Sequence, residues 1–235
     1  MHLLAQAMND WLIAKDDGKT TTGVYIDISK AFYKVCHHPL LLRQHSAEIG
    51  GIALGWLANY LRHRYQLVIT DTGSSTHLSF NRGVPQGSVI GPLLFHLYVS
   101  QLYLTEIAAA KAATLLMFAA DRTQYTAQRD RTLAAAIATD ALDAISDALI
   151  VLGLSINTLK TKTMFILPPH STQDGNVVIT YWRNPSDVVN HVQCLGVQVD
   201  DSLPWSHHAD ATIAQVSRKI GALKRERRQL SVQAR

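Results

Sequence analysis

Apolar and polar residues alternate with two different periods along the chain, and these periods predict helices and strands. A spacing of three to four residues indicates helices with one buried face, in residues 1–15, 39–64, 89–102, 132–152 and 205–228, with a break near Gly50-Gly51. Segments rich in β-branched and aromatic residues indicate strands, in residues 21–28, 66–70, 76–80, 114–118, 123–128, 163–167, 177–181 and 192–199. This order predicts an α+β fold, a sheet with helices on one face.

Turn-forming and capping residues delimit these elements. Asp71-Thr72-Gly73 separates two strand segments and predicts a hairpin. Ser88 precedes one helix and can cap its first turn, and Gly153 follows another helix where glycine commonly ends one. In the helix at 132–152 we expect the larger apolar side chains to face the core, namely Leu133, Ile137, Leu142, Ile145 and Leu149.

Two strand-like segments that lie far apart in the sequence end in an aspartate. Asp27 closes the first strand, and Asp121 lies within residues 119–122, the expected tip of the hairpin that spans 114–128. Carboxylates at strand ends can meet at one edge of a sheet and hold divalent metal, which is the geometry of two-metal phosphoryl transfer. Such a site would use two adjacent carboxylates at the tip, but the residue before Asp121 is Ala120.

Composition indicates a globular protein of ordinary type. The 235 residues are 47% hydrophobic and 17% charged, which suits one large domain or one domain plus the start of a second. No apolar stretch approaches the roughly 20 residues of a membrane span, and the N-terminus does not resemble a signal peptide. The two cysteines, Cys36 and Cys194, lack a CxxC spacing. We therefore expect an intracellular protein, in cytoplasm or nucleus, without disulfides.

Positive charge is concentrated at the C-terminal end. Residues 218–235 hold seven basic residues and one acidic residue, a net charge of +6, whereas the whole chain carries +4. A basic helix on a near-neutral body suits contact with a nucleic-acid backbone. A solvated helix face that lacks a neighbouring domain explains the same charges, and composition does not separate the two interpretations.

Five sequence blocks follow one another at defined spacings. They are DISKAFYKVCH at 27–37, GVPQGSVIGPLLF at 83–95, FAADR at 118–122, LGLSIN at 152–157 followed by Lys160-Thr161, and LGV at 195–197. In order and spacing they resemble the motifs of the reverse transcriptases (RNA-directed DNA polymerases) of non-LTR, LINE-like retrotransposons. The resemblance implies a polymerase palm with a ferredoxin-like antiparallel sheet in residues 1–200 and the start of a helical thumb in 201–235, with the fingers segment missing.

The resemblance also implies partners and site residues. The partners are an RNA template, a DNA primer, deoxynucleotides and Mg²⁺. The metal ligands would be Asp27, Asp121 and the backbone carbonyl of Ile28, and Lys160 would lie near the leaving pyrophosphate. Further residues would contact nucleic acid: Phe32 under the sugar of the incoming nucleotide, Gly83, Pro85, Gln86 and Gly87 near the nucleotide or template, and Leu195 and Gly196 in the primer grip. From the residues alone, a core aromatic remains an alternative for Phe32, and a solvated lysine remains an alternative for Lys160.

Three residues depart from the family pattern around this chemistry. Ala120 stands where the family has the first aspartate of the pair, Arg122 replaces a small residue, and Tyr33 replaces another aspartate. We therefore expect a catalytically impaired polymerase domain. An alternative of a different class is a non-enzymatic nucleic-acid-binding remnant that uses the basic tail and the palm groove. A third is an open reading frame without a role.

Overall fold

The computed structural model describes residues 2–46, 49–109, 113–118, 121–171, 177–182, 184–203 and 206–227. The elements from the N-terminus to residue 109 are α1 (His2–Asp16), β1 (Thr20–Ile26), α2 (Ala31–Lys34), α3 (His37–Ser46), α4 (Gly51–Leu61), β2 (Tyr65–Gln66), β3 (Ile69–Thr70), β4 (Gly73–Ser74), β5 (Leu78–Ser79) and α5 (Gly91–Ala109). The later elements are β6 (Thr114–Phe118), β7 (Asp121–Gln128), α6 (Arg131–Val151), β8 (Lys162–Ile166), β9 (Thr180–Tyr181), β10 (Asn184–Pro185), β11 (Asp187–Val188), β12 (His191–Cys194), β13 (Val197–Asp200) and α7 (Ser206–Arg227).

The centre of the fold is a five-stranded sheet in the order β11-β8-β1-β7-β6. β1 pairs antiparallel with both β7 and β8, β6 and β7 form a hairpin, and β11 adds to β8 in parallel. With α5 between β1 and β6, and α6 between β7 and β8, the four strands β8, β1, β7 and β6 have the order and connections of a ferredoxin-like sheet. The predicted α+β palm class is therefore confirmed.

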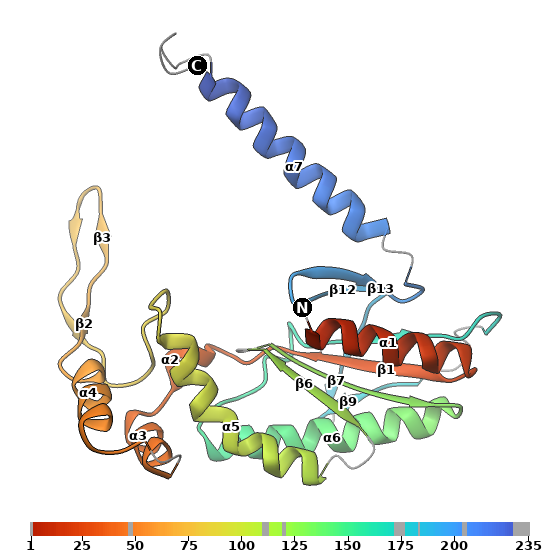
Figure 1. Cartoon of the computed structure of the whole chain (residues 1–235), viewed down its shortest axis with the longest axis horizontal. Helices are drawn as coiled ribbons and strands as arrows, with labels where there is room; N and C mark the ends of the chain where they lie inside the picture. The colour runs from red at the N-terminus through yellow and green to blue at the C-terminus, as the bar shows by residue number, and fades with distance from the viewer. Residues whose placement is uncertain are drawn as a thin grey trace.

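Both faces of the sheet carry apolar side chains. Val24 and Ile26 of β1 belong to a core cluster with α5 and α6, whereas Tyr25 belongs to a second cluster with Trp11 of α1. Figure 1 shows α1 and α6 on opposite sides of the sheet. Helices α5 and α6 share one face as expected, but α1 covers the other. The physical reason is that all seven residues of β1 are buried, so the strand presents no solvent face.

Several boundaries differ from the sequence-based expectation. Residues 192–199 form two strands, because Leu195 and Gly196 take positive φ angles of 50° and 83° and turn the chain. The expected strand at 177–181 is reduced to Thr180–Tyr181. Leu133 does not face the core: the buried stripe of α6 begins with small residues such as Ala134, which let the helix approach the sheet closely, and leaves Leu133 half-exposed.

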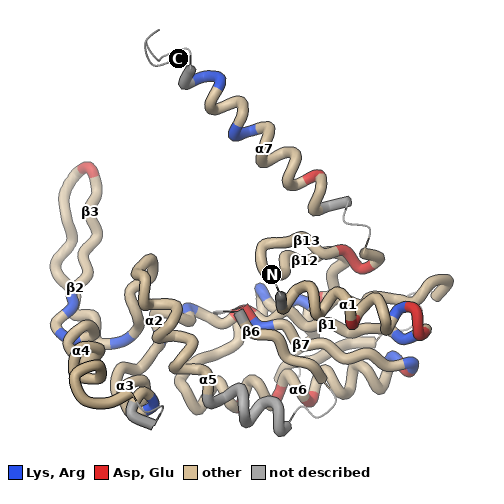
Figure 2. The backbone as a smooth tube through the Cα atoms, in the orientation of Figure 1, with Lys and Arg blue, Asp and Glu red and all other residues tan. Residues whose placement is uncertain are grey.

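Two elements project from the sheet layers. The hairpin predicted around Asp71-Thr72-Gly73 is a long ribbon of the short strands β2 to β5 (Figure 1). Helix α7 extends away from the palm, and Figure 2 shows Lys and Arg positions along its backbone. Near its start, the backbone N–H of Gln198 in β13 donates to Nδ1 of His208, at 3.4 Å. Among the described helices, none is long and apolar enough to cross a membrane.

Candidate active site

The structure brings Asp27 and Asp121 together at one edge of the sheet. Asp27 directly follows β1 and Asp121 opens β7, and the antiparallel pairing of Ile26 with Arg122 sets the two aspartates opposite each other. Both residues line one cavity of about 370 Å³. Ala119 and Ala120, including the position of the expected extra carboxylate, lie outside the described residues. The hairpin tip is shorter than the four residues predicted, because Asp121 and Arg122 belong to β7.

The two carboxylates influence each other electrostatically. Partial burial raises the pKa of Asp121, and the negative charge of Asp27 raises it further. Two like charges at close range share a proton or a cation more readily than they coexist as bare anions. The described parts of the chain contain no group of three or more His, Cys, Asp or Glu side chains suited to a metal ion. Among the described residues, the metal donors at this edge of the sheet are therefore this pair of carboxylates, oxygen ligands of the kind that Mg²⁺ prefers.

Arg122 directly follows Asp121 in β7. Side chains alternate along β7, so Arg122 shares a face with Gln124, whose amide donates to the carbonyl of Ala138 in α6 at 2.6 Å. Thr123 shares the opposite face with Asp121, and its hydroxyl lies 3.8 Å from the sulfur of Cys194. Arg122 is buried. It also lines the cavity that holds Asp27 and Asp121, so the expectation of a fixed positive charge near the carboxylates stays a prediction.

A loop after α6 holds the segment that carries Asp27. The backbone N–H of Asn157 donates to the carbonyl of Asp27 at 2.8 Å, and that of Ser29 donates to the carbonyl of Ser155 at 2.9 Å. The N–H of Asp27 donates to the hydroxyl of Thr161 at 3.3 Å. These bonds on both sides of Ile28 fix its backbone at the cavity edge. They also explain why the LGLSIN block and the Lys160-Thr161 pair belong to the same site.

A second cavity, of about 540 Å³, lies on the other side of Asp27. Its lining includes Ile28, Phe32, Gln86 and Lys160. Asp27 and Lys160 also line the first cavity, so they form the boundary between the two. The ring of Phe32 packs on that of Phe95, with 5.0 Å between centroids, and the residue also lines the cavity. Its place under the sugar of a nucleotide stays a prediction.

The GVPQG turn packs directly on the segment that follows Asp27. The N–H of Gly83 donates to the carbonyl of Val35 at 2.6 Å, and the N–H of Val84 donates to that of Phe32 at 2.7 Å. An N–H of His37 donates to the carbonyl of Gly83, at 2.7 Å. Gly83 has a φ of 90°, a conformation that glycine adopts without strain. The turn is therefore held against the wall of the second cavity by backbone contacts.

The rest of this turn leads into α5. The hydroxyl of Ser88 donates to the carbonyl of Pro85 at 2.7 Å, and its oxygen accepts from the N–H of Gly91 at 3.0 Å. Ser88 thus accepts from the first N–H of the helix as a capping side chain does, but α5 begins at Gly91 rather than at Val89 as predicted. Gln86 is exposed and lines the second cavity, and the neighbouring Gly87, also exposed, has a φ of 85°.

The β12–β13 hairpin closes the first cavity. Leu195 lines this cavity together with Gln193 and Cys194, and Gly196 completes the turn. Cys194 is buried, and this burial raises the pKa of its thiol. The family motifs did not indicate Cys194 or Lys162, which also lines this cavity. A signal for Lys162 did exist in the sequence, because it is the charged first residue of a strand that pairs with β1.

Comparison with known proteins gives consistent matches. The model of the family "Reverse transcriptase (RNA-dependent DNA polymerase)" matches residues 4–199. A probable RNA-directed DNA polymerase from transposon X-element of Drosophila melanogaster is 26% identical over 228 residues, which cover 92% of this chain and 24% of that protein. A probable RNA-directed DNA polymerase from transposon BS of the same organism is 34% identical over 91 residues, covering 39% of this chain and 10% of that protein. The chain thus spans a quarter or less of these relatives.

Solved structures with a similar fold include telomerases. Telomerase from Candida tropicalis, in complex with a fragment of telomeric RNA, has a TM-score of 0.54 at 11% identity and covers 86% of this chain and 32% of that one. An apo telomerase from the same organism, lacking its C-terminal domain, has a TM-score of 0.50 at 13% identity and covers 83% of this chain and 38% of that one. At such identities the likeness concerns the fold alone.

Proposed function

Because the chain belongs to the reverse transcriptase (RNA-dependent DNA polymerase) family, we propose that it is the palm and thumb root of a non-LTR retrotransposon polymerase with impaired catalysis. The palm is residues 1–200 and the thumb root is 201–235. One observation carries the proposal: Asp27 lies opposite Asp121 and between two cavities, one lined by Phe32 and Gln86 and the other by Leu195.

In this proposal the two cavities hold the two reactants. The deoxynucleotide occupies the larger cavity, with its sugar over Phe32, its base pair near Gln86 and its triphosphate near Lys160. A ring below the sugar clashes with a 2′-hydroxyl, which favours deoxynucleotides. The DNA primer, paired with the RNA template, places its 3′ end in the smaller cavity beneath Leu195 and Gly196. Asp27, at the boundary, is then next to both reacting groups.

The chemistry follows from this arrangement. The primer 3′-hydroxyl attacks the α-phosphate, the bond to the β-phosphate breaks, and pyrophosphate leaves with its charge balanced by Lys160. Bound by Asp27, Asp121 and the carbonyl of Ile28, Mg²⁺ would neutralise charge on the attacking and leaving oxygens. Asp27 and Asp121 must both be deprotonated for this role, and the raised pKa of Asp121 makes proton and metal compete for it.

Impairment is proposed because Ala120 supplies no carboxylate to this set. In the family that position and Asp27 hold the metals together, so two carboxylates remain where three are expected. Loss of a ligand that organises the metal costs several kcal/mol at the transition state, a rate reduction on the order of 10²–10³-fold. Tyr33, exposed at the wall of the larger cavity, takes the place of another family aspartate.

Primer extension tests this proposal. The natural chain and an Ala120→Asp, Tyr33→Asp double variant are given a DNA primer on an RNA template, deoxynucleotides, and Mg²⁺ or Mn²⁺. We expect no extension by the natural chain and measurable extension by the double variant, which is lost when Asp27→Asn is added. Robust extension by the natural chain would contradict the proposed impairment. Failure of both proteins to bind the primer–template would overturn the proposed function itself.

A second candidate function is nucleic-acid binding without catalysis. It is favoured by the exposed basic residues of α7, namely Arg218, Lys219, Lys224 and Arg225. Binding through such a helix should weaken steeply with salt. Deletion of residues 218–235 should then abolish binding, and binding that is absent or independent of salt counts against this candidate.

A further inference from the structure

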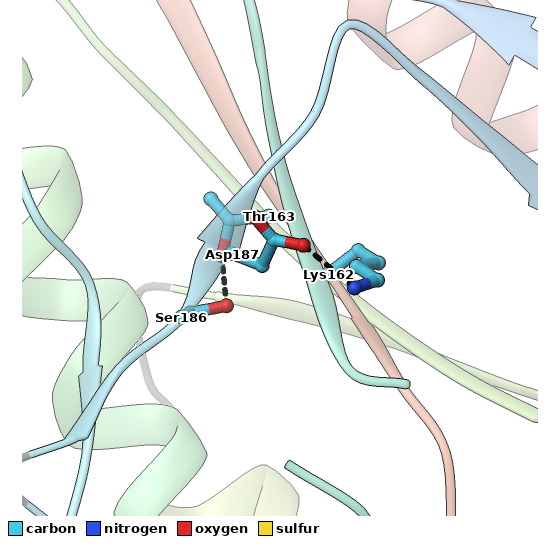
Figure 3. Close-up of polar contacts among 4 residues, drawn as sticks. All are labelled: Lys162, Thr163, Ser186 and Asp187. Atoms are coloured by element: carbon cyan, nitrogen blue, oxygen red, sulfur yellow. Dashed lines mark hydrogen bonds and ion pairs between the residues drawn. The ribbon is translucent and has the colours of Figure 1, made fainter. Parts of the chain in front are cut away.

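Lys162 is a cation of the smaller cavity that none of the roles above uses. It lines the cavity together with Asp27, Asp121 and Lys160. Its ammonium lies 2.7 Å from a carboxylate oxygen of Asp187, and the two side chains face each other across neighbouring strands (Figure 3). The side chain of Lys162 is 30% exposed and that of Asp187 is 63% exposed. The pair is therefore accessible to solvent and to a ligand in the cavity.

The pair is positioned by the backbone rather than by chance contact of two long side chains. Lys162 opens β8, and its direct partner in the parallel strand β11 is Asp187. The hydroxyl of Thr163 donates to that of Ser186 at 2.8 Å (Figure 3). The N–H of Val189 donates to the carbonyl of Thr163 at 2.9 Å. These bonds hold β11 in register beside the first two residues of β8. Asp187 is thus presented to Lys162 at a fixed place on the cavity rim.

The position of Lys162 distinguishes it from Lys160. Lys160 lines both cavities, whereas the lining of the larger, nucleotide-side cavity does not include Lys162. On the primer side, Lys162 shares the cavity with Gln193 and Leu195 of the β12–β13 hairpin. A phosphodiester entering a cavity that holds two carboxylates is repelled unless a cation balances its charge. Lys162 is a cation that can do so without leaving the cavity.

From this geometry we propose that Lys162 binds a backbone phosphate of the primer strand, and that Asp187 holds its ammonium in place until that strand arrives. The inference rests on the proposed function and adds a residue for the partner at the same site. Exposed ion pairs of this kind are weak, so the exchange of Asp187 for a phosphate is possible at little cost. Asp187 then acts as a competitor of the primer, and the two residues have opposite effects on binding.

Equilibrium binding of a labelled DNA primer on an RNA template tests the proposal in a series of salt concentrations. Deoxynucleotides are omitted and EDTA is present, so that neither a triphosphate nor a metal contributes. Lys162→Gln should weaken binding by about two- to fivefold and reduce the salt slope by about one. Asp187→Asn should tighten binding by a similar factor, about two- to fivefold, because it removes the competing carboxylate.

A matched ion pair elsewhere in the chain provides the control. Lys19 and Asp17 lie 2.9 Å apart with 38% and 50% exposed side chains, and they precede β1, at the opposite end of that strand from Asp27. Lys19→Gln and Asp17→Asn should leave primer affinity unchanged. Thermal melts of all four variants confirm that each protein is folded.

Opposite shifts for Lys162→Gln and Asp187→Asn support the proposal. If the pair were purely structural, both variants would shift affinity in the same direction or not at all, and either result overturns it. The proposal is also overturned if Lys162→Gln weakens binding of a labelled deoxynucleoside triphosphate but not of the primer–template. Lys162 would then bind a phosphate of the nucleotide. Absence of any primer–template binding by the natural chain overturns the proposed function, and this inference with it.

Discussion

Gly83→Ala is expected to destabilise the protein and to disturb the nucleotide side of the site. A Cβ atom at this position would lie 2.8 Å from the carbonyl oxygen of Phe32, 2.9 Å from Cα of Tyr33 and 2.9 Å from the carbonyl oxygen of Tyr33. All three are backbone atoms and cannot rotate away. The carbonyl of Phe32 also accepts the hydrogen bond from Val84, so relief of the clash would loosen the turn.

The expected loss of unfolding free energy in Gly83→Ala has two parts, and a comparison with Gly87 distinguishes them. The positive φ of Gly83 alone should cost an alanine about 1–2 kcal/mol, and the overpacking against backbone about 1–3 kcal/mol more. Gly87 has nearly the same φ, 85° against 90°, but a Cβ there would meet no atom within 4 Å. Gly87→Ala should therefore cost only the first part, about 1–2 kcal/mol, and the difference between the variants measures the close approach.

Urea denaturation of both variants and the natural chain measures these free energies of unfolding. We expect Gly83→Ala to lose more stability than Gly87→Ala by about 1–3 kcal/mol, with an unchanged dependence on urea concentration. Equal losses in the two variants would refute the claim that the GVPQG turn is held by direct backbone contact with residues 32–33.

Two further predictions concern single side chains. Asp121→Asn should raise the melting temperature at neutral pH, because the raised pKa of Asp121 means that its ionised form destabilises the folded state. The gain in melting temperature should grow as pH rises from about 4 through that raised pKa, and it should disappear below about pH 4. Thermal melts across this pH range check it, and a constant difference would contradict it. Asp130→Ala should lower stability by about 1 kcal/mol, since the Asp130 carboxylate accepts from the N–H groups of Thr132 and Leu133 at the start of α6; denaturation alone suffices, and an unchanged midpoint would count against the cap.

Much of the site could be predicted from local sequence. Asp27 and Asp121 were expected to meet at one edge of the sheet, and they do so because Asp27 follows the end of β1 whereas Asp121 opens β7, which pairs antiparallel with β1. Ser88 was recognised as a cap from its position alone, and the structure has it accepting from Gly91. These features depend on neighbours within a few residues or on strand ends, which the pattern of apolar positions records directly.

Other features depend on contacts that no local pattern records. The side of the sheet covered by α1 could not be read from β1, because every residue of that strand is buried. The turn at Leu195 could not be predicted, because leucine seldom takes a positive φ. The pairing of Lys162 with Asp187 joins residues 25 positions apart through a parallel strand of two residues, too short to be seen in the sequence.

The central claim is that Asp27 and Asp121 are the remaining part of a polymerase metal site that lacks the carboxylate of position 120. Incorporation of a single deoxynucleotide by the natural chain, Ala120→Asp and Ala120→Asn tests it most directly, since aspartate and asparagine differ in charge but hardly in size. We expect Ala120→Asp to incorporate the deoxynucleotide faster than either other protein, by on the order of 10²–10³-fold. Equal rates for all three proteins, with the natural chain active, would contradict it.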